Sequence, residues 1–176
     1  TYGSGVCEIS AKGDVRNLYD ADILGENHVH DLLFDRKGHL WIGCQDAQLV
    51  EVTQDGYRYY PVDNVKSLAL LPDGRIAAGT ITGLYIVTPG EKKVTELSYF
   101  SSDSNQANRS ILDIFIHDER YIDIATDGGG LYVYDLRTGN CRQLTMKDGL
   151  PSNTVTSVTQ DGLGRLWLAT DRGLSF

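Results

Sequence analysis

The chain has 176 residues, with 24 acidic against 16 basic side chains and a net charge of −8 at pH 7. This balance disfavours nucleic acid as a partner, because proteins bind phosphate backbones through basic patches or stripes. No apolar run approaches the ~20 residues that cross a bilayer, so no membrane contact is expected for this segment.

One sequence phrase recurs along the chain and dominates its organisation. Each copy reads as an inner strand, a turn containing Asp or Gly, an apolar second strand and a Thr-x-x-Gly-like turn. The copies span 29–52, 65–87, 111–134 and 155–176, and residues 1–9 match 126–134, so the chain begins inside a fifth copy. Repeats of about 40 to 45 residues carrying four strands are typical of propeller blades.

In chain order, inner strands are expected at Val29 to Phe34, Val65 to Leu70, Ile111 to Ile116 and Val155 to Thr159. Their apolar runs suit strands covered on both faces by neighbouring blades. We therefore predict an all-β fold of β-propeller blades, each a four-stranded antiparallel sheet, with about four blades in total. The blade boundaries are expected near 1–27, 28–63, 64–109, 110–153 and 154–176.

Both ends of the chain hold partial copies of the repeat. The first copy has only its second half, and the last stops in its third strand. This favours a segment of a larger propeller. The alternative is that the two partial blades pair with each other and close a four-bladed ring.

A family resemblance is carried by DGLPSNTVTSVTQDGLGRLWLATDRGLSF at 148–176, with weaker echoes in NHVHDLLFDRKGHLWIGCQDAQL and SILDIFIHDERYIDIATDGGGLYVY. These phrases resemble the two-component regulator propeller repeat, although the 65–87 copy has Ala77 where others have Trp. The resemblance implies the periplasmic sensor region of a hybrid histidine kinase of Bacteroides type, whose partners are the remaining blades and the kinase. It also implies a non-enzymatic module that senses a small ligand, often an oligosaccharide.

Trp41 and Trp167 occupy the same position in the second strand of their copies. An aromatic ring can stack on a sugar, but a repeated Trp between apolar strand residues favours packing between blades. We therefore predict that both are structural core residues.

Carboxylates recur where a propeller opens on one rim, in the turns after the second strands and near the starts of the inner strands. Converging carboxylates can accept hydrogen bonds from sugar hydroxyls or hold Ca²⁺. The alternative is that each Asp caps its own turn or satisfies a neighbouring amide. The variable link at 98–110 adds two aromatic residues. The candidates for ligand binding are Asp31, Asp46, Asp113, Asp127, Asp171, Tyr99 and Phe100.

Catalysis, metals and cofactors find little support in the sequence. Gly3-Ser4-Gly5 lacks the strand-to-helix context of a nucleophile elbow, and the histidines show no metal-ligand spacing. Cys7, Cys44 and Cys141 are expected to be free thiols buried in strands. No metal or cofactor is predicted. A structural or protein-interaction propeller, including a homodimer, stays open as an alternative, and a propeller lyase or hydrolase is a third reading.

Overall fold

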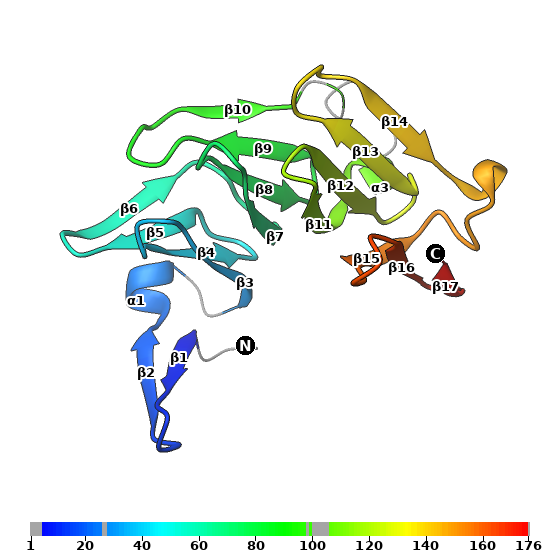
Figure 1. The fold of residues 1–176 in the computed structure, drawn as a ribbon. Helices are drawn as coiled ribbons and strands as arrows, with labels where there is room; N and C mark the ends of the chain where they lie inside the picture. The colour runs from blue at the N-terminus through cyan, green and yellow to red at the C-terminus, as the bar shows by residue number, and fades with distance from the viewer. Residues whose placement is uncertain (1–4, 26–27, 98, 100–105, 176) are drawn as a thin grey trace.

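The computed structural model describes residues 5–25, 28–97, 99 and 106–175 and consists almost entirely of antiparallel sheets set along an arc (Figure 1). Phe100 lies outside the described residues. Within these ranges, no helix is long and apolar enough to cross a membrane. The all-β propeller architecture predicted from the repeat is therefore confirmed.

Three sheets have four strands in chain order. Blade I contains β3 (Val29–Phe34), β4 (Leu40–Cys44), β5 (Leu49–Thr53) and β6 (Gly56–Tyr60). Blade II contains β7 (Val65–Leu70), β8 (Ile76–Thr80), β9 (Leu84–Val87) and β10 (Val94–Glu96). Blade III contains β11 (Ile111–His117), β12 (Tyr121–Thr126), β13 (Leu131–Asp135) and β14 (Cys141–Leu144).

Shorter sheets lie at the two ends of the arc. The N-terminal sheet pairs β1 (Val6–Ile9) with β2 (Val15–Tyr19), and blade IV contains β15 (Val155–Gln160), β16 (Leu166–Thr170) and β17 (Gly173–Ser175). The connections hold α1 (Ala21–Leu24), α3 (Gln106–Arg109) and a 3-10 turn at Met146–Asp148. Among the described residues the two end sheets remain separate, so the pairing that would close a four-bladed ring is not formed.

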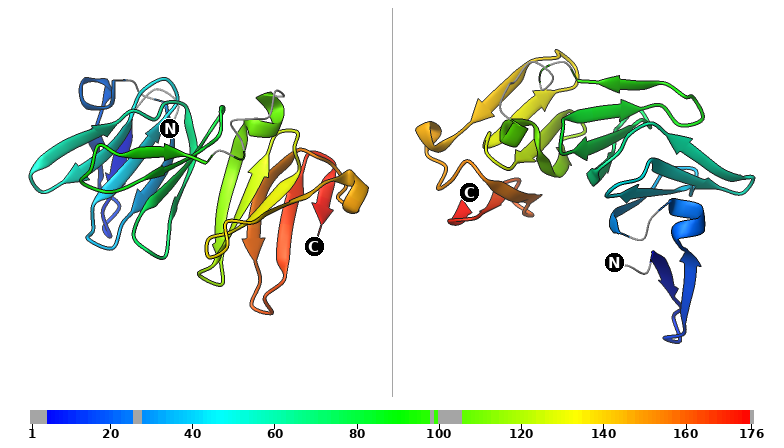
Figure 2. Two further views of the ribbon diagram at one scale, coloured as in Figure 1. Left: turned by 90° about the horizontal axis from the view of Figure 1, so that it is seen from above. Right: turned by 180° about the vertical axis from the view of Figure 1, so that it is seen from behind.

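The inner strands β3, β7, β11 and β15 follow one another on the concave side of the arc, and each contacts the next (Figure 1). Seen from above, the sheets stand face to face (Figure 2). Apolar side chains fill each space between sheets. Gly43 and Gly79 allow the closest approach, because a Cβ on either would lie within 2.6 Å of a side-chain carbon of Val65 or Ile111 in the next blade.

A polar contact also joins each inner strand to the next. The inner strands each contain an irregularity in register after their first residue, which is typical of a β-bulge. Beyond it, Oδ2 of Asp31 accepts the Leu68 N–H at 2.7 Å, and Oδ2 of Asp113 accepts the Val158 N–H at 2.9 Å. Between them, Oγ of Ser67 accepts the N–H of Ile114 at 3.1 Å. We call these three contacts the inter-blade clasps.

The two tryptophans differ in burial although they occupy equivalent positions. Trp41 is fully buried between blades I and II, where its ring packs on Tyr60 with centroids 5.0 Å apart. Trp167 is only partly buried, since it lies on the face of blade IV that no described sheet covers. Its Nε1 donates to Oδ2 of Asp161 at 2.8 Å.

The three cysteines are free, as expected, but they differ in burial. Cys44 is buried and Cys141 is intermediate, whereas Cys7 is exposed. The expectation that all three are buried is therefore wrong for Cys7. It lies in the two-stranded N-terminal sheet, which has fewer strands to cover it.

The burial difference predicts unequal losses of stability. Trp41→Ala should lower the free energy of unfolding by about 3–5 kcal/mol, because it leaves a cavity between two blades. Trp167→Ala should lower it clearly less, since its ring is already partly in water. Chemical denaturation of both variants measures the difference, and equal losses would contradict the assigned burial.

The clasps give a second prediction. Asp113→Ala removes the acceptor for the Val158 N–H and for the Ser157 hydroxyl, which donates at 2.8 Å. Leaving these donors unpaired should lower the free energy of unfolding by about 1–3 kcal/mol. Asp171→Ala, in an exposed turn, serves as the control and should change it by less than about 0.5 kcal/mol. A loss at Asp171 as large as that at Asp113 would count against the clasp.

Candidate functional site

The structure brings the second turns and the links between blades to one rim. In blade I, the Gln45 N–H donates to the His28 carbonyl at 3.1 Å. Equivalent bonds join Asp127 to Ser110 at 3.0 Å and Asp171 to Thr154 at 3.3 Å. In blades I, III and IV, the turn after the second strand is therefore tied to the residues just before its own inner strand. The side chains of Asp46, Asp127 and Asp171 are exposed on this rim.

Asp31 and Asp113 lie a short way into the inner strands, where the clasps already engage their carboxylates. Burial raises the pKa of Asp31, and the negative charge of Asp113 acts in the same direction. The alternative reading of an Asp that satisfies a neighbouring amide thus describes the geometry of both residues. Ligand contact by either one stays a prediction.

Tyr99 combines exposure with a defined position. Its ring is 45% exposed and meets Tyr132 edge to face, with centroids 5.6 Å apart. The Tyr132 hydroxyl lies close to the second turn of blade III, because a Cβ at Gly129 would contact it. The side-chain amide of Gln143 donates both to this hydroxyl and to the Gly129 carbonyl. This places the Tyr99 ring near the turn that carries Asp127.

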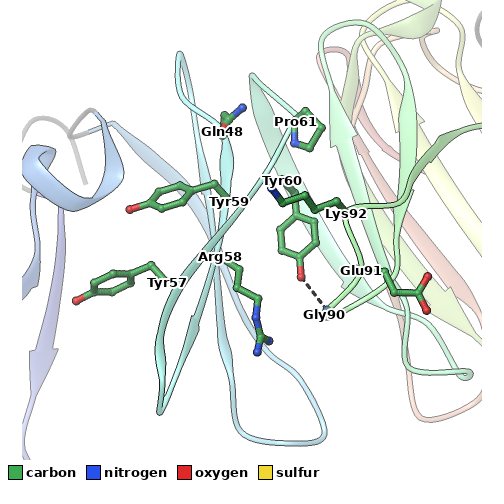
Figure 3. Close-up of a pocket in the computed structure, with 9 residues that line it drawn as sticks. All are labelled: Gln48, Tyr57, Arg58, Tyr59, Tyr60, Pro61, Gly90, Glu91 and Lys92. Carbon is green, nitrogen blue, oxygen red and sulfur yellow. Dashed lines mark hydrogen bonds between the residues drawn. The ribbon is translucent and has the colours of Figure 1, made fainter.

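A groove of about 690 Å³ lies between the outer strand β6 and the β9–β10 turn (Figure 3). The rings of Tyr57 and Tyr59 point away from that turn, toward the N-terminal sheet. There the Tyr59 hydroxyl donates to the Ile23 carbonyl at 3.0 Å, and Tyr57 meets Tyr19 edge to face. The groove is lined by Gln48, Tyr57, Arg58, Tyr59, Tyr60, Pro61, Gly90, Glu91 and Lys92.

The groove connects to a buried polar network through Tyr60. The Tyr60 hydroxyl accepts the Gly90 N–H at 2.8 Å and donates to Oε2 of Glu51 at 2.6 Å. Burial and the bond to Glu51 raise the pKa of Tyr60 to about 12, so the phenol stays protonated. The Tyr60 hydroxyl thus links the outer strand of blade I both to Glu51 inside that blade and to the hairpin turn of blade II.

Asp123 is the second buried carboxylate with an unusual environment. It is fully buried at the position that Trp41 and Trp167 occupy in other blades, opposite Phe115 and Val133 on the neighbouring strands. Its Oδ2 lies 2.6 Å from Nδ1 of His117, whereas its Oδ1 has no hydrogen-bond partner among the described residues. Burial raises the pKa of Asp123 to about 6, against the opposing effect of His117.

Sequence reasoning missed Glu51, Tyr60, Asp123 and the groove. A signal existed for two of them, because Asp123 replaces a repeated Trp, and Glu51 stands where blades II and III have Ile86 and Val133. A charged residue in a position that is apolar in sister repeats indicates a local function or a specific partner. The groove has no such signal, since it forms between two blades.

The sheets and the repeat define this chain as part of a β-propeller. The model of the two-component regulator propeller family matches residues 23–46 and 149–172, so the chain carries two recognisable copies of this repeat. The resemblance to this repeat that the sequence indicates is therefore confirmed. No curated protein matches the sequence significantly.

Solved structures show the same fold. The extracellular domain of a putative hybrid two-component system from B. thetaiotaomicron is 20% identical with a TM-score of 0.81, and the match covers 97% of this chain but 25% of that one. A putative one-component system from the same organism is 18% identical with a TM-score of 0.76, covering 94% and 23%. PorZ of the Porphyromonas gingivalis type-IX secretion system is 15% identical with a TM-score of 0.72, covering 98% and 29%. The chain therefore spans about a quarter of these neighbours.

The buried Asp123 predicts a specific pH dependence. Because its folded pKa is raised from 3.8 to about 6, the contribution of this group to stability is present at low pH and is lost as pH rises through about 6. Asp123→Asn keeps the shape but cannot ionise. The stability of the variant relative to the unsubstituted chain should therefore increase between pH 4 and pH 6 and then level off. Denaturation across this range measures it, and a difference independent of pH would contradict the burial of the charge.

Proposed function

We propose that this chain is part of the extracytoplasmic sensor propeller of a two-component system and binds a small carbohydrate-like ligand on one rim. The family repeat and the sensor domains among the structural neighbours support the sensor class. A further neighbour, 12% identical with a TM-score of 0.61, is an auxiliary nutrient binding protein from Bacteroides ovatus. The periplasm is the compartment that such a sensor would occupy.

The observation that carries the ligand site is the pairing of Tyr99 with the turn of Asp127. An exposed aromatic ring held edge to face on Tyr132 offers a surface for stacking on a sugar ring. The exposed carboxylate of Asp127 can accept hydrogen bonds from sugar hydroxyls. Tyr99 belongs to the link between blades II and III, and its contact with Tyr132 brings it near the turn of Asp127, so one small saccharide would contact both.

Transmission of the signal rests on the rigidity of the arc. Every seam between blades I to IV combines apolar packing with a clasp, so the movement of one inner strand displaces the next. A ligand that orders the rim of blade III would thereby reach neighbouring blades and, through them, a kinase outside this chain. This segment would then bind and transmit without catalysing a reaction.

Tyr99→Ala and Asp127→Ala should each weaken saccharide binding about tenfold or more, since each removes a stacking surface or a charged acceptor. The probe is a panel of xylo-, arabino- and gluco-oligosaccharides titrated into the chain by calorimetry. Asp55→Ala is the matched control, because Asp55 is an exposed turn residue at the opposite end of the strands. It should bind as the unsubstituted chain does.

Two outcomes would count against the proposal. Binding that is unchanged in both rim variants, with the fold intact, would place the saccharide site elsewhere. Failure of the folded chain to bind any member of the panel would favour the interaction propeller, in which the outer faces dock a protein partner.

A further inference from the structure

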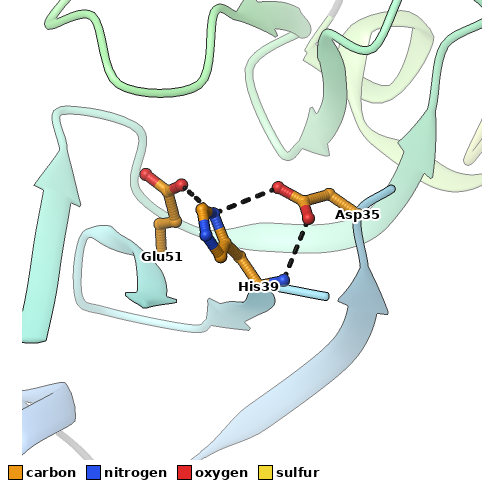
Figure 4. Close-up of side chains that lie close together, drawn as sticks. All are labelled: Asp35, His39 and Glu51. Atoms are coloured by element: carbon orange, nitrogen blue, oxygen red, sulfur yellow. Dashed lines mark hydrogen bonds and ion pairs between the residues drawn. The ribbon is translucent and has the colours of Figure 1, made fainter. Parts of the chain in front are cut away.

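Three metal-ligating side chains converge inside blade I (Figure 4). Asp35 directly follows β3, His39 immediately precedes β4, and Glu51 lies in the middle of β5. Nδ1 of His39 is 2.8 Å from Oε1 of Glu51 and 3.4 Å from Oδ2 of Asp35. The three ligand atoms lie within 4.8 Å of one another. Glu51 is fully buried and Asp35 is 8% exposed, so this is an interior cluster.

Donors other than the imidazole hold the remaining carboxylate oxygens. Oδ1 of Asp35 accepts the N–H groups of Lys37 and His39 at 2.8 and 2.9 Å. Oε2 of Glu51 accepts the Tyr60 hydroxyl at 2.6 Å. The second oxygen of each carboxylate lies near the imidazole and accepts one longer bond, from Nε1 of Trp41 to Oδ2 of Asp35 at 3.3 Å and from Nη1 of Arg58 to Oε1 of Glu51 at 3.5 Å. Outer hydrogen bonds of this kind orient the ligands of metal sites.

The equivalent positions in sister blades contain a different charge balance. Arg75 in blade II and Arg165 in blade IV stand where blade I has His39, and each guanidinium binds an Asp of its turn at 2.7 Å. The position of Glu51 is apolar in blades II and III. Blade I thus has an additional buried carboxylate and lacks the permanent cation.

Buried carboxylates require compensation by a cation or by strong donors. Arg58 supplies part of it, but its Nη1 lies 3.4 Å from Oε2 and 3.5 Å from Oε1 of Glu51, and its side chain is 46% exposed. Nδ1 of His39 lies within reach of both carboxylates and makes the shortest contact between them. A cation at this point would restore the balance that an arginine provides in the sister blades.

We propose that Asp35, His39 and Glu51 bind one Zn²⁺ ion, with water completing its coordination. One imidazole nitrogen and two carboxylate oxygens form a ligand set typical of zinc, whereas Ca²⁺ and Mg²⁺ prefer oxygen ligands alone. Ligands at about 2.0–2.2 Å from a tetrahedral Zn²⁺ lie about 3.3–3.5 Å apart. The 3.4 Å pair already has this separation, and the 2.8 Å pair opens slightly when the ion replaces the shared proton. The imidazole binds through Nδ1 in the tautomer that carries its proton on Nε2.

The decisive variant is His39→Arg, which copies the residue of blades II and IV. Arginine can pair with Asp35 and Glu51 but cannot bind a metal, so this variant should fold and lose zinc binding. Zinc chloride is titrated by calorimetry into the chelator-treated chain, carrying Cys7→Ser so that the exposed thiol does not compete. The expected result is one equivalent of bound Zn²⁺ and a rise in Tm, both absent from His39→Arg.

Two further variants separate a built site from surface binding. Tyr60→Phe removes the donor behind Glu51 and should weaken zinc affinity about 10- to 100-fold. His30→Gln removes an exposed histidine outside the cluster and should leave the affinity unchanged. Zinc binding by His39→Arg equal to that of the parent chain would overturn the proposal. A folded parent chain that binds no zinc would also overturn it.

Discussion

The clasp between neighbouring inner strands is the contact on which the arc depends. Inner strands of adjacent blades lie side by side without a backbone ladder, so their facing N–H groups need other acceptors. Asp31, Ser67 and Asp113 supply them across three successive seams. The irregularity near the start of each inner strand precedes this side chain, and the bonds themselves are partly or fully buried. The polar contact fixes how neighbouring inner strands are placed relative to each other, whereas most of the stabilisation comes from the apolar layers.

Charged residues that depart from the repeat mark positions with a local chemistry of their own. Ala77 replaces a Trp without adding a charge, and its blade packs as an ordinary apolar layer. Asp123, at the same position, brings a buried charge and a histidine partner. Glu51 does the same on the third strand of blade I. A repeat architecture permits this because the remaining blades keep the neighbouring seams intact.

Most of the fold could be predicted from the sequence, but little of the candidate site could. Inner strands were predictable because short apolar runs separated by Gly- or Asp-containing turns are a local signal. The strands β3 and β7 have the expected bounds. The bulges were not predictable, since an extra residue leaves no mark in composition. The cluster of Asp35, His39 and Glu51 was equally hidden, because its third member joins across a hairpin. The directions of Tyr57 and Tyr59 depend on the preceding sheet, which periodicity cannot place.

The clasps also divide the rim into two kinds of carboxylate. Those of Asp31 and Asp113 already accept backbone donors, so in the proposed sensor a ligand that used them would compete with a clasp and weaken the contact between blades. Asp46, Asp127 and Asp171 lie instead on exposed turns, outside the clasps. Recognition can therefore vary in turns and links while the inner strands keep their chemistry. In the proposed sensor, this separation would let the ligand change without changing how the blades hold together.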